Sequence, residues 1–180
     1  MGKRHLKLAT EEWIMASIFL LVISVVTVAG CSSSNEAEAR KYCVSGTNVI
    51  TESKVETTPT NLPKDIKTLT DKIAIGAISL SDIRGELTRL DDELNLMKDA
   101  FAKANAEYSK VQGLSGIDDW VEYSKNLIKV NNTIVKVDES YLLALHEYMR
   151  LIEAGQPADI NSIVAGVATQ LAPIEEEMGA

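Results

Sequence analysis

The sequence predicts an all-α protein: an antiparallel helical bundle of three long helices plus a short leading helix, with an N-terminal apolar signal or anchor helix. Apolar residues recur at spacings of three and four along residues 80–111, and a broader apolar face repeats every seven residues along 117–154. Only short, glycine-containing segments separate these stretches. Short connections between long helices favour antiparallel neighbours. No strand is required, although a short strand pair within 44–55 stays open as an alternative.

The first thirty residues combine a basic start with a long apolar run. Three basic side chains lie within residues 3–7, and no charged side chain occurs from 13 to 30. Small residues then lead to a cysteine in Val28-Ala29-Gly30-Cys31. This order resembles the signal sequence of prokaryotic lipoproteins, which implies cleavage before Cys31 and lipidation of its thiol. The alternative is an uncleaved spanning helix, although the apolar run falls slightly short of about 20 residues.

Both interpretations place the rest of the chain on the extracytoplasmic side of a membrane, because the basic flank stays inside. The resemblance implies a lipid anchor in the cell membrane or in an outer membrane, since two or more acyl chains anchor a protein stably. We therefore expect residues 1–30 to be a signal peptide, 31–63 a flexible polar linker and 64–180 the helical bundle. The linker prediction rests on a composition rich in Ser, Thr, Asn, Glu and Lys and on the helix-breaking Pro59 and Pro63.

A short leading helix is predicted over 64–75 from the spacing of Ile66, Leu69 and Ile73. Gly76 suits the position after its last turn. Ser79 or Ser81 then offers an N-cap oxygen for the next helix.

Residues 80–111 carry the strongest periodicity in the chain. Ten positions alternate strictly by three and four, which is the a/d pattern of a coiled coil: Leu80, Ile83, Leu87, Leu90, Leu94, Met97, Phe101, Ala104, Tyr108 and Val111. A narrow stripe of this kind needs one neighbouring helix, whereas a broad face buries against two.

The helix predicted over 117–154 has such a broad face, so we expect it at the centre of the bundle. Adjacent apolar residues recur there every seven positions: Trp120/Val121, Leu127/Ile128, Ile134/Val135, Tyr141/Leu142 and Tyr148/Met149. Asn131-Asn132 is a point at which this helix is expected to kink or break. Gly155 and Pro157 end it, and a last helix follows with Pro173 as a kink or weak end.

The heptads of 80–111 are also compatible with an intermolecular coiled coil. In a parallel homodimer Glu93 would attract Lys98, but Glu86 would repel Asp91, so the charges encode no preference for a parallel pair. Two long helices joined by a short turn have a high effective concentration for each other. We therefore expect internal packing and a monomeric domain.

The net charge of −8 bounds the partners. Residues 1–30 hold three basic and two acidic side chains, so the chain after them carries −9. An acidic surface argues against nucleic acid, whose phosphates need Lys and Arg patches. It also argues against electrostatic docking onto anionic lipids, so attachment to the membrane must come from the anchor.

Candidate sites are few. If Cys31 is acylated, Cys43 has no partner within the chain and is either an inert thiol in the flexible linker or forms an intermolecular disulfide. Ser124, Asn131 and Asp138 fall on or beside the apolar face of the 117–154 helix, where they occupy boundary positions, set the helix register or line a small polar pocket. His146 has no second ligand at helical spacing and is expected at the surface or at the boundary of the core. No catalytic, cofactor-binding or metal-binding constellation is recognised.

The function predicted from the sequence is therefore a non-catalytic structural or protein-interaction role in the cell envelope, with an unknown envelope protein as partner. The alternative is a small-ligand-binding or sensor module that uses the polar residues of the 117–154 helix. A hydrolytic enzyme is least compatible with the sequence, because no nucleophile–base pair is recognised.

Overall fold

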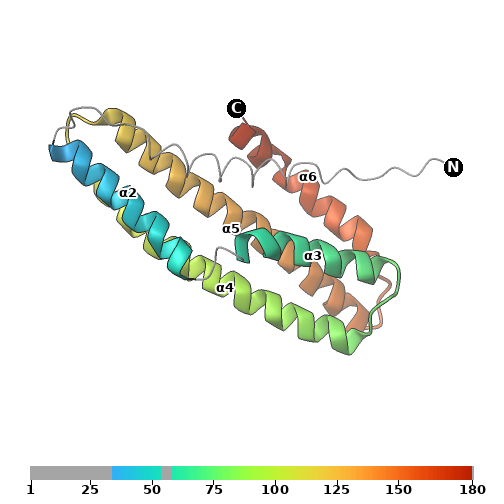
Figure 1. Cartoon of the computed structure of the whole chain (residues 1–180). Helices are drawn as coiled ribbons and strands as arrows, with labels where there is room; N and C mark the ends of the chain where they lie inside the picture. The colour runs from blue at the N-terminus through green and yellow to red at the C-terminus, as the bar shows by residue number, and fades with distance from the viewer. Residues whose placement is uncertain (1–33, 54–57, 180) are drawn as a thin grey trace.

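The computed structural model describes residues 34–53 and 58–179, and within them the protein is entirely helical. Five helices pack against one another (Figure 1): α2 Ser34–Glu52, α3 Thr58–Ala74, α4 Leu80–Val111, α5 Asp118–Glu153 and α6 Ile160–Gly179. The expected signal or anchor helix lies outside the described residues. None of the described helices has the length and apolar character needed to cross a bilayer.

α4 and α5 form a long antiparallel hairpin, as the sequence predicted (Figure 1). α4 begins at Leu80 because the Ser79 hydroxyl accepts a hydrogen bond from the Asp82 N–H at 3.2 Å, which caps the helix. All the predicted a and d residues of α4 are buried except Leu80, which is 46% exposed at the first turn. The periodicity therefore located both the helix and its packing face.

Two of the helix ends share one glycine-based geometry. Gly76 after α3 has φ 66° and Gly155 after α5 has φ 68°. In each case the next residue donates its N–H to a carbonyl five positions back, Ala77 to Lys72 and Gln156 to Leu151, both at 2.9 Å. This is the Schellman motif, in which glycine adopts the left-handed conformation without steric cost. Both predicted ends are confirmed.

The predicted flexible linker is wrong for most of its length. Residues 34–52 form α2, which packs along α4, and the next helix begins at Thr58, upstream of the predicted start at 64. Pro63 lies inside α3 and does not prevent it, and the neighbouring Leu62 is fully buried. The strand pair left open within 44–55 is replaced by helix through Glu52.

α2 and α3 together follow α4 in the antiparallel direction. Near one end, the Asn35 side-chain amide donates to the Ser115 carbonyl at 2.9 Å. Further along, Asp65 of α3 pairs with Arg89 of α4 at 3.0 Å. The two shorter helices thus act as one interrupted column beside the hairpin.

α5 contacts each of the other four described helices, so its predicted central position is confirmed. It continues without interruption through Asn131-Asn132, where a kink or break was expected. α6 packs on α5 and runs through Pro173. α4 has more neighbours than its narrow stripe predicted, because it packs against α2 and α3 as well as α5.

The apolar interior consists of two clusters. The main core lies among α3, α4, α5 and α6 and is mostly aliphatic, with Leu62, Leu90, Met97 and Leu145 among its fully buried members. A smaller cluster joins α2 to the turn between α4 and α5. We call it the end cluster; its buried members are Ala39, Cys43, Val111 and Ile117, and aromatic residues surround it, including Trp120 and Tyr123.

Candidate functional site

The three polar residues predicted on the apolar face of α5 are all buried. Ser124, Asn131 and Asp138 are respectively 0%, 7% and 3% exposed, and they repeat every seven residues along one line of the helix. Asn131 reaches across to α4, so this line faces the hairpin partner. The structure therefore brings the predicted residues into one seam but spaces them two turns apart, along the helix rather than around a common point.

Ser124 and Asn131 of the seam make hydrogen bonds within the protein. The Ser124 hydroxyl donates to the Val121 carbonyl at 2.9 Å. The Asn131 amide donates to the side-chain oxygen of Asn105 at 2.8 Å, and the Asn105 amide donates in turn to Asn132 at 3.0 Å. A buried amide needs such partners, and their geometry fixes the position of α5 along α4. The observed contacts favour the register-setting role at Asn131 over a ligand pocket.

A ladder of polar pairs runs along one edge of the hairpin. Arg84 pairs with Glu153, Asp91 with His146, Lys98 with Glu139 and Asn105 with Asn132. Successive members are seven residues apart on both helices, rising on α4 and falling on α5. This is the spacing of an antiparallel coiled coil. Each charged pair joins opposite signs when His146 is protonated.

Sequence reasoning missed this ladder. The charge pairs of a parallel homodimer, in which Lys98 would face Glu93, encode no preference and do not reveal it. The sequence does contain a signal for the ladder. Arg84, Asp91 and Lys98 are spaced seven residues apart, and so are His146 and Glu139, which pair with Asp91 and Lys98 when the two helices are antiparallel. Each exposed pair stabilises the fold by at most about 1 kcal/mol, so the ladder selects orientation and register more than it adds stability.

His146 is exposed, as predicted, but it has a partner across the hairpin. Its Nε2 lies 3.0 Å from both carboxylate oxygens of Asp91. Within residues 34–53 and 58–179, no three His, Cys, Asp or Glu side chains are grouped as a metal site would need.

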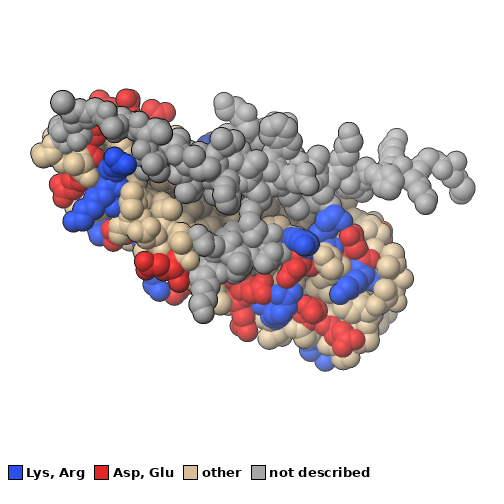
Figure 2. Space-filling view, in the orientation of Figure 1, with Lys and Arg blue, Asp and Glu red and all other residues tan. Residues whose placement is uncertain are grey.

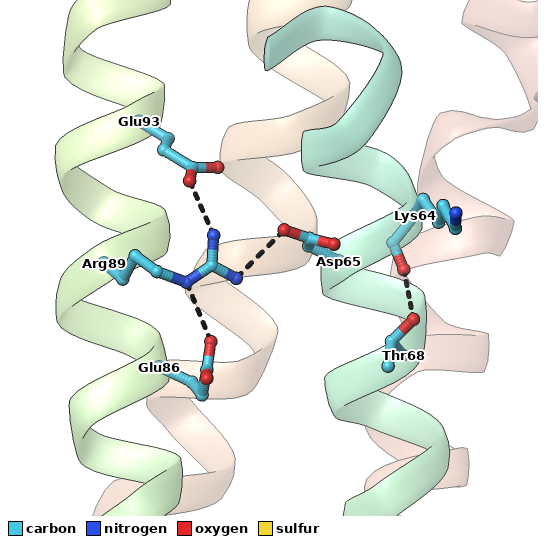
Figure 3. A network of polar contacts seen from close by, with 6 residues as sticks. All are labelled: Lys64, Asp65, Thr68, Glu86, Arg89 and Glu93. Carbon is cyan, nitrogen blue, oxygen red and sulfur yellow. Dashed lines mark hydrogen bonds and ion pairs between the residues drawn. The ribbon is translucent and has the colours of Figure 1, made fainter. Parts of the chain in front are cut away.

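Arg89 connects α3 to α4 on the surface (Figure 3). It donates to Glu86 at 2.9 Å, to Glu93 at 2.5 Å and to Asp65 of α3 at 3.0 Å. Burial opposes its charged form, but the hydrogen bonds to Glu86 and Asp65 outweigh that effect and raise the pKa of Arg89. Beside it, the Thr68 hydroxyl satisfies the Lys64 carbonyl within α3 at 2.7 Å. The guanidinium thus acts as a three-way clamp that holds α3 in place.

Cys43 is 1% exposed and belongs to the end cluster. A second chain could not reach its thiol unless α2 left the bundle. The structure therefore argues against the intermolecular disulfide at Cys43 and for an inert thiol, but this thiol lies in a packed helix and not in the predicted flexible linker. Burial raises the pKa of Cys43 to about 11, which lowers its reactivity further, because the thiolate is the reactive form.

Gly46 and Tyr108 make a close contact that the sequence did not reveal. Tyr108 is 2% exposed, and its hydroxyl lies 3.3 Å from the Thr47 hydroxyl of α2. A β-carbon placed on Gly46 would lie 2.3 Å from Cε1 of the Tyr108 ring. Only glycine leaves room here, so α2 is fitted to this part of α4 and not merely adjacent to it.

Two surface hollows involve residues other than those of the polar seam. One lies at the α3–α4 turn, around Lys72, Ile78 and Ser79. Another lies beside α5 and α6, around Lys125, Lys136 and Ile174. Both are open to solvent, and neither is lined by Ser124, Asn131 or Asp138. On the face drawn in Figure 2, basic and acidic side chains are interspersed.

Cys31, the predicted lipidation site, lies outside the described residues, so its prediction rests on the sequence. Comparisons of the chain with protein-family models, with curated proteins and with solved structures find no match.

Proposed function

We propose that this chain is a lipid-anchored, extracytoplasmic helical-bundle protein with a non-catalytic structural or protein-interaction role in the cell envelope. The observation that carries the proposal is the segment Val28-Ala29-Gly30-Cys31 after a basic start and an uncharged apolar run. Small residues before a cysteine suit cleavage at that position and leave a thiol that accepts lipid. Acyl chains on Cys31 then anchor an acidic domain that would not bind anionic headgroups by charge.

The build of the bundle supports a role that depends on shape. Its side-chain amides bond to one another across the hairpin, Arg89 joins α3 to α4, and the two hollows are open to solvent. A structural or interaction protein needs a stiff scaffold with a chemically mixed surface, and these features provide one.

The anchor is tested by intact-mass analysis of the protein from the membrane fraction of its native host. We expect a chain that starts at residue 31 and carries the mass of acyl chains. The matched control is Cys31→Ser, which removes the acceptor thiol and should abolish the added mass. An unmodified Cys31 on the full-length chain, or a protein found dissolved inside the cell, would contradict the proposal.

The alternative, a small-ligand-binding or sensor module, predicts a different result in a thermal-shift screen. A compound that raises the melting temperature of the wild type, but not of Asn131→Ala, would place a ligand at the seam. The hydrogen bonds that already occupy Asn131 make us expect no such compound.

A further inference from the structure

The distance between the proposed anchor and the folded bundle is very short. α2 begins at Ser34, and only Ser32 and Ser33 separate it from Cys31. A chain spans at most about 3.6 Å per residue, so the three steps from Cys31 to Ser34 cover no more than about 11 Å. If Cys31 carries lipid, as the proposed function states, the first turn of α2 must lie close to the headgroups.

The first turn of α2 is in turn fixed to one end of the bundle. Asn35 donates to the Ser115 carbonyl in the α4–α5 turn, and Ala39 and Cys43 pack with Val111 and Ile117 in the end cluster. α2 therefore cannot act as a spacer that holds the bundle away from the membrane, because detaching α2 would expose the end cluster to water. We call this end, made of the first turn of α2 and residues 112–120, the proximal end.

We propose that the bundle stands upright on the bilayer, with its proximal end against the lipid headgroups and its long helices pointing away from the membrane. α4 has 32 residues and α5 has 36, so the opposite end, with the α3–α4 and α5–α6 turns, lies roughly 50 Å away. An acidic domain is repelled along its length by anionic headgroups, which opposes a flat orientation.

The residues of the proximal end suit contact with headgroups without insertion. Trp120 is partly exposed there, and its ring packs edge to face on the ring of Tyr123, with 6.0 Å between the ring centroids. Such amphipathic rings favour the boundary between lipid and water. Asp118 and Asp119 are exposed beside it, and their charges oppose entry into the acyl region. The surface that meets the membrane is therefore small and shallow.

The chain after Cys31 offers a natural probe, since Trp120 is the one tryptophan that follows the predicted cleavage site. The acylated protein is reconstituted into vesicles of phosphatidylcholine and an anionic phospholipid that carry a dansyl group on a fraction of the headgroups. Energy transfer from tryptophan to dansyl falls steeply with distance. The matched control moves the probe to the far end by combining Trp120→Phe with Ile75→Trp, because Ile75 is 78% exposed in the α3–α4 turn.

We expect transfer from Trp120 to be several-fold more efficient than transfer from the probe at position 75. Equal transfer from both positions would show a bundle that lies flat, and stronger transfer from position 75 would show the inverted orientation; either result overturns the proposal. The intact mass of the same sample separates the two proposals. Acylated protein with weak transfer from Trp120 contradicts only the orientation, whereas an unacylated Cys31 contradicts the anchor and with it the orientation.

Discussion

Gly46 shows how a single missing methyl group decides the fit between two helices. In an exposed helix, replacing glycine by alanine stabilises the protein by about 0.5–1 kcal/mol. At position 46 the new β-carbon would lie 2.3 Å from Cε1 and 2.7 Å from Cδ1 of Tyr108. The ring is buried and held beside Thr47, so it cannot move away without disturbing the packing. The steric cost must outweigh the gain in helix propensity.

We therefore expect Gly46→Ala to lower the free energy of unfolding by about 1–3 kcal/mol. The matched control is Gly85→Ala in α4, where a β-carbon would meet nothing within 4 Å. That variant should be more stable than the wild type by about 0.5–1 kcal/mol. Urea unfolding followed by circular dichroism measures both. If Gly46→Ala proves as stable as Gly85→Ala, α2 does not pack on Tyr108 as described.

At the scale of the element, α2 explains why part of the fold escaped sequence reasoning. Its buried positions are Ala39, Cys43 and Gly46, none of which is a large aliphatic residue. Such small residues give little hydrophobic periodicity, yet they allow α2 to approach α4 closely. The segments 80–111 and 117–154 were located correctly because bulky residues mark their faces. The same pattern could not reveal α2, whose packing depends on the absence of side-chain volume.

A pair of aspartate substitutions tests whether residues 34–52 are a packed helix or a linker. Ala39 is fully buried, so Ala39→Asp places a charge without a partner in the end cluster and should cost about 3 kcal/mol or more. Ala37 is exposed near the start of α2, so Ala37→Asp should change stability by less than about 0.5 kcal/mol. Thermal unfolding of the two variants decides the matter. If neither substitution changes the thermal stability, residues 34–52 are a flexible linker and not a packed helix.

The polar ladder makes a second prediction at this scale, because it distinguishes internal packing from a parallel homodimer. Lys98 lies 2.7 Å from Glu139 in the hairpin, whereas a parallel dimer would place it opposite Glu93. A double-mutant cycle with Lys98→Glu and Glu139→Lys should give a coupling energy of about 0.2–1 kcal/mol. The matched cycle with Glu93→Lys should give none. Coupling to Glu93 instead would favour the intermolecular coiled coil.

At the scale of the whole molecule, the sequence predicted the central hairpin but not the third column beside it. α2 and α3 form that column jointly, with a break between Glu52 and Thr58. No local pattern announces that two separate helices share one partner, because this depends on where α4 runs. The sequence identified the seam residues of α5 as a set. Their partner across the hairpin, Asn105, belongs to a different helix, so this hydrogen bond could not be predicted from α5 alone.

The column formed by α2 and α3 gives the two ends of the molecule different buried side chains, because α2 packs at one end and α3 at the other. The main core is largely aliphatic, whereas the end cluster places Cys43 near Tyr108 and Tyr123. Burial raises the pKa of Cys43 to about 11, raises that of Tyr123 to about 12 and also raises that of Tyr108. The folded state therefore holds these groups neutral at pH values at which the unfolded chain ionises them. Their contribution to stability is complete below the unfolded pKa values and is lost as pH rises through the folded ones.

For Cys43 the window runs from about 8.5, the usual thiol pKa, to about 11. Between pH 8 and pH 10.5, the urea midpoint of the reduced wild type should fall more than that of Cys43→Ala. Every other ionisable group is present in both proteins, so the difference between the two pH dependences isolates the thiol. The small cavity left by alanine lowers the urea midpoint at every pH but does not change how steeply the midpoint depends on pH. Parallel curves would mean that the thiol reaches solvent in the folded protein, and with it that α2 does not cover the end cluster.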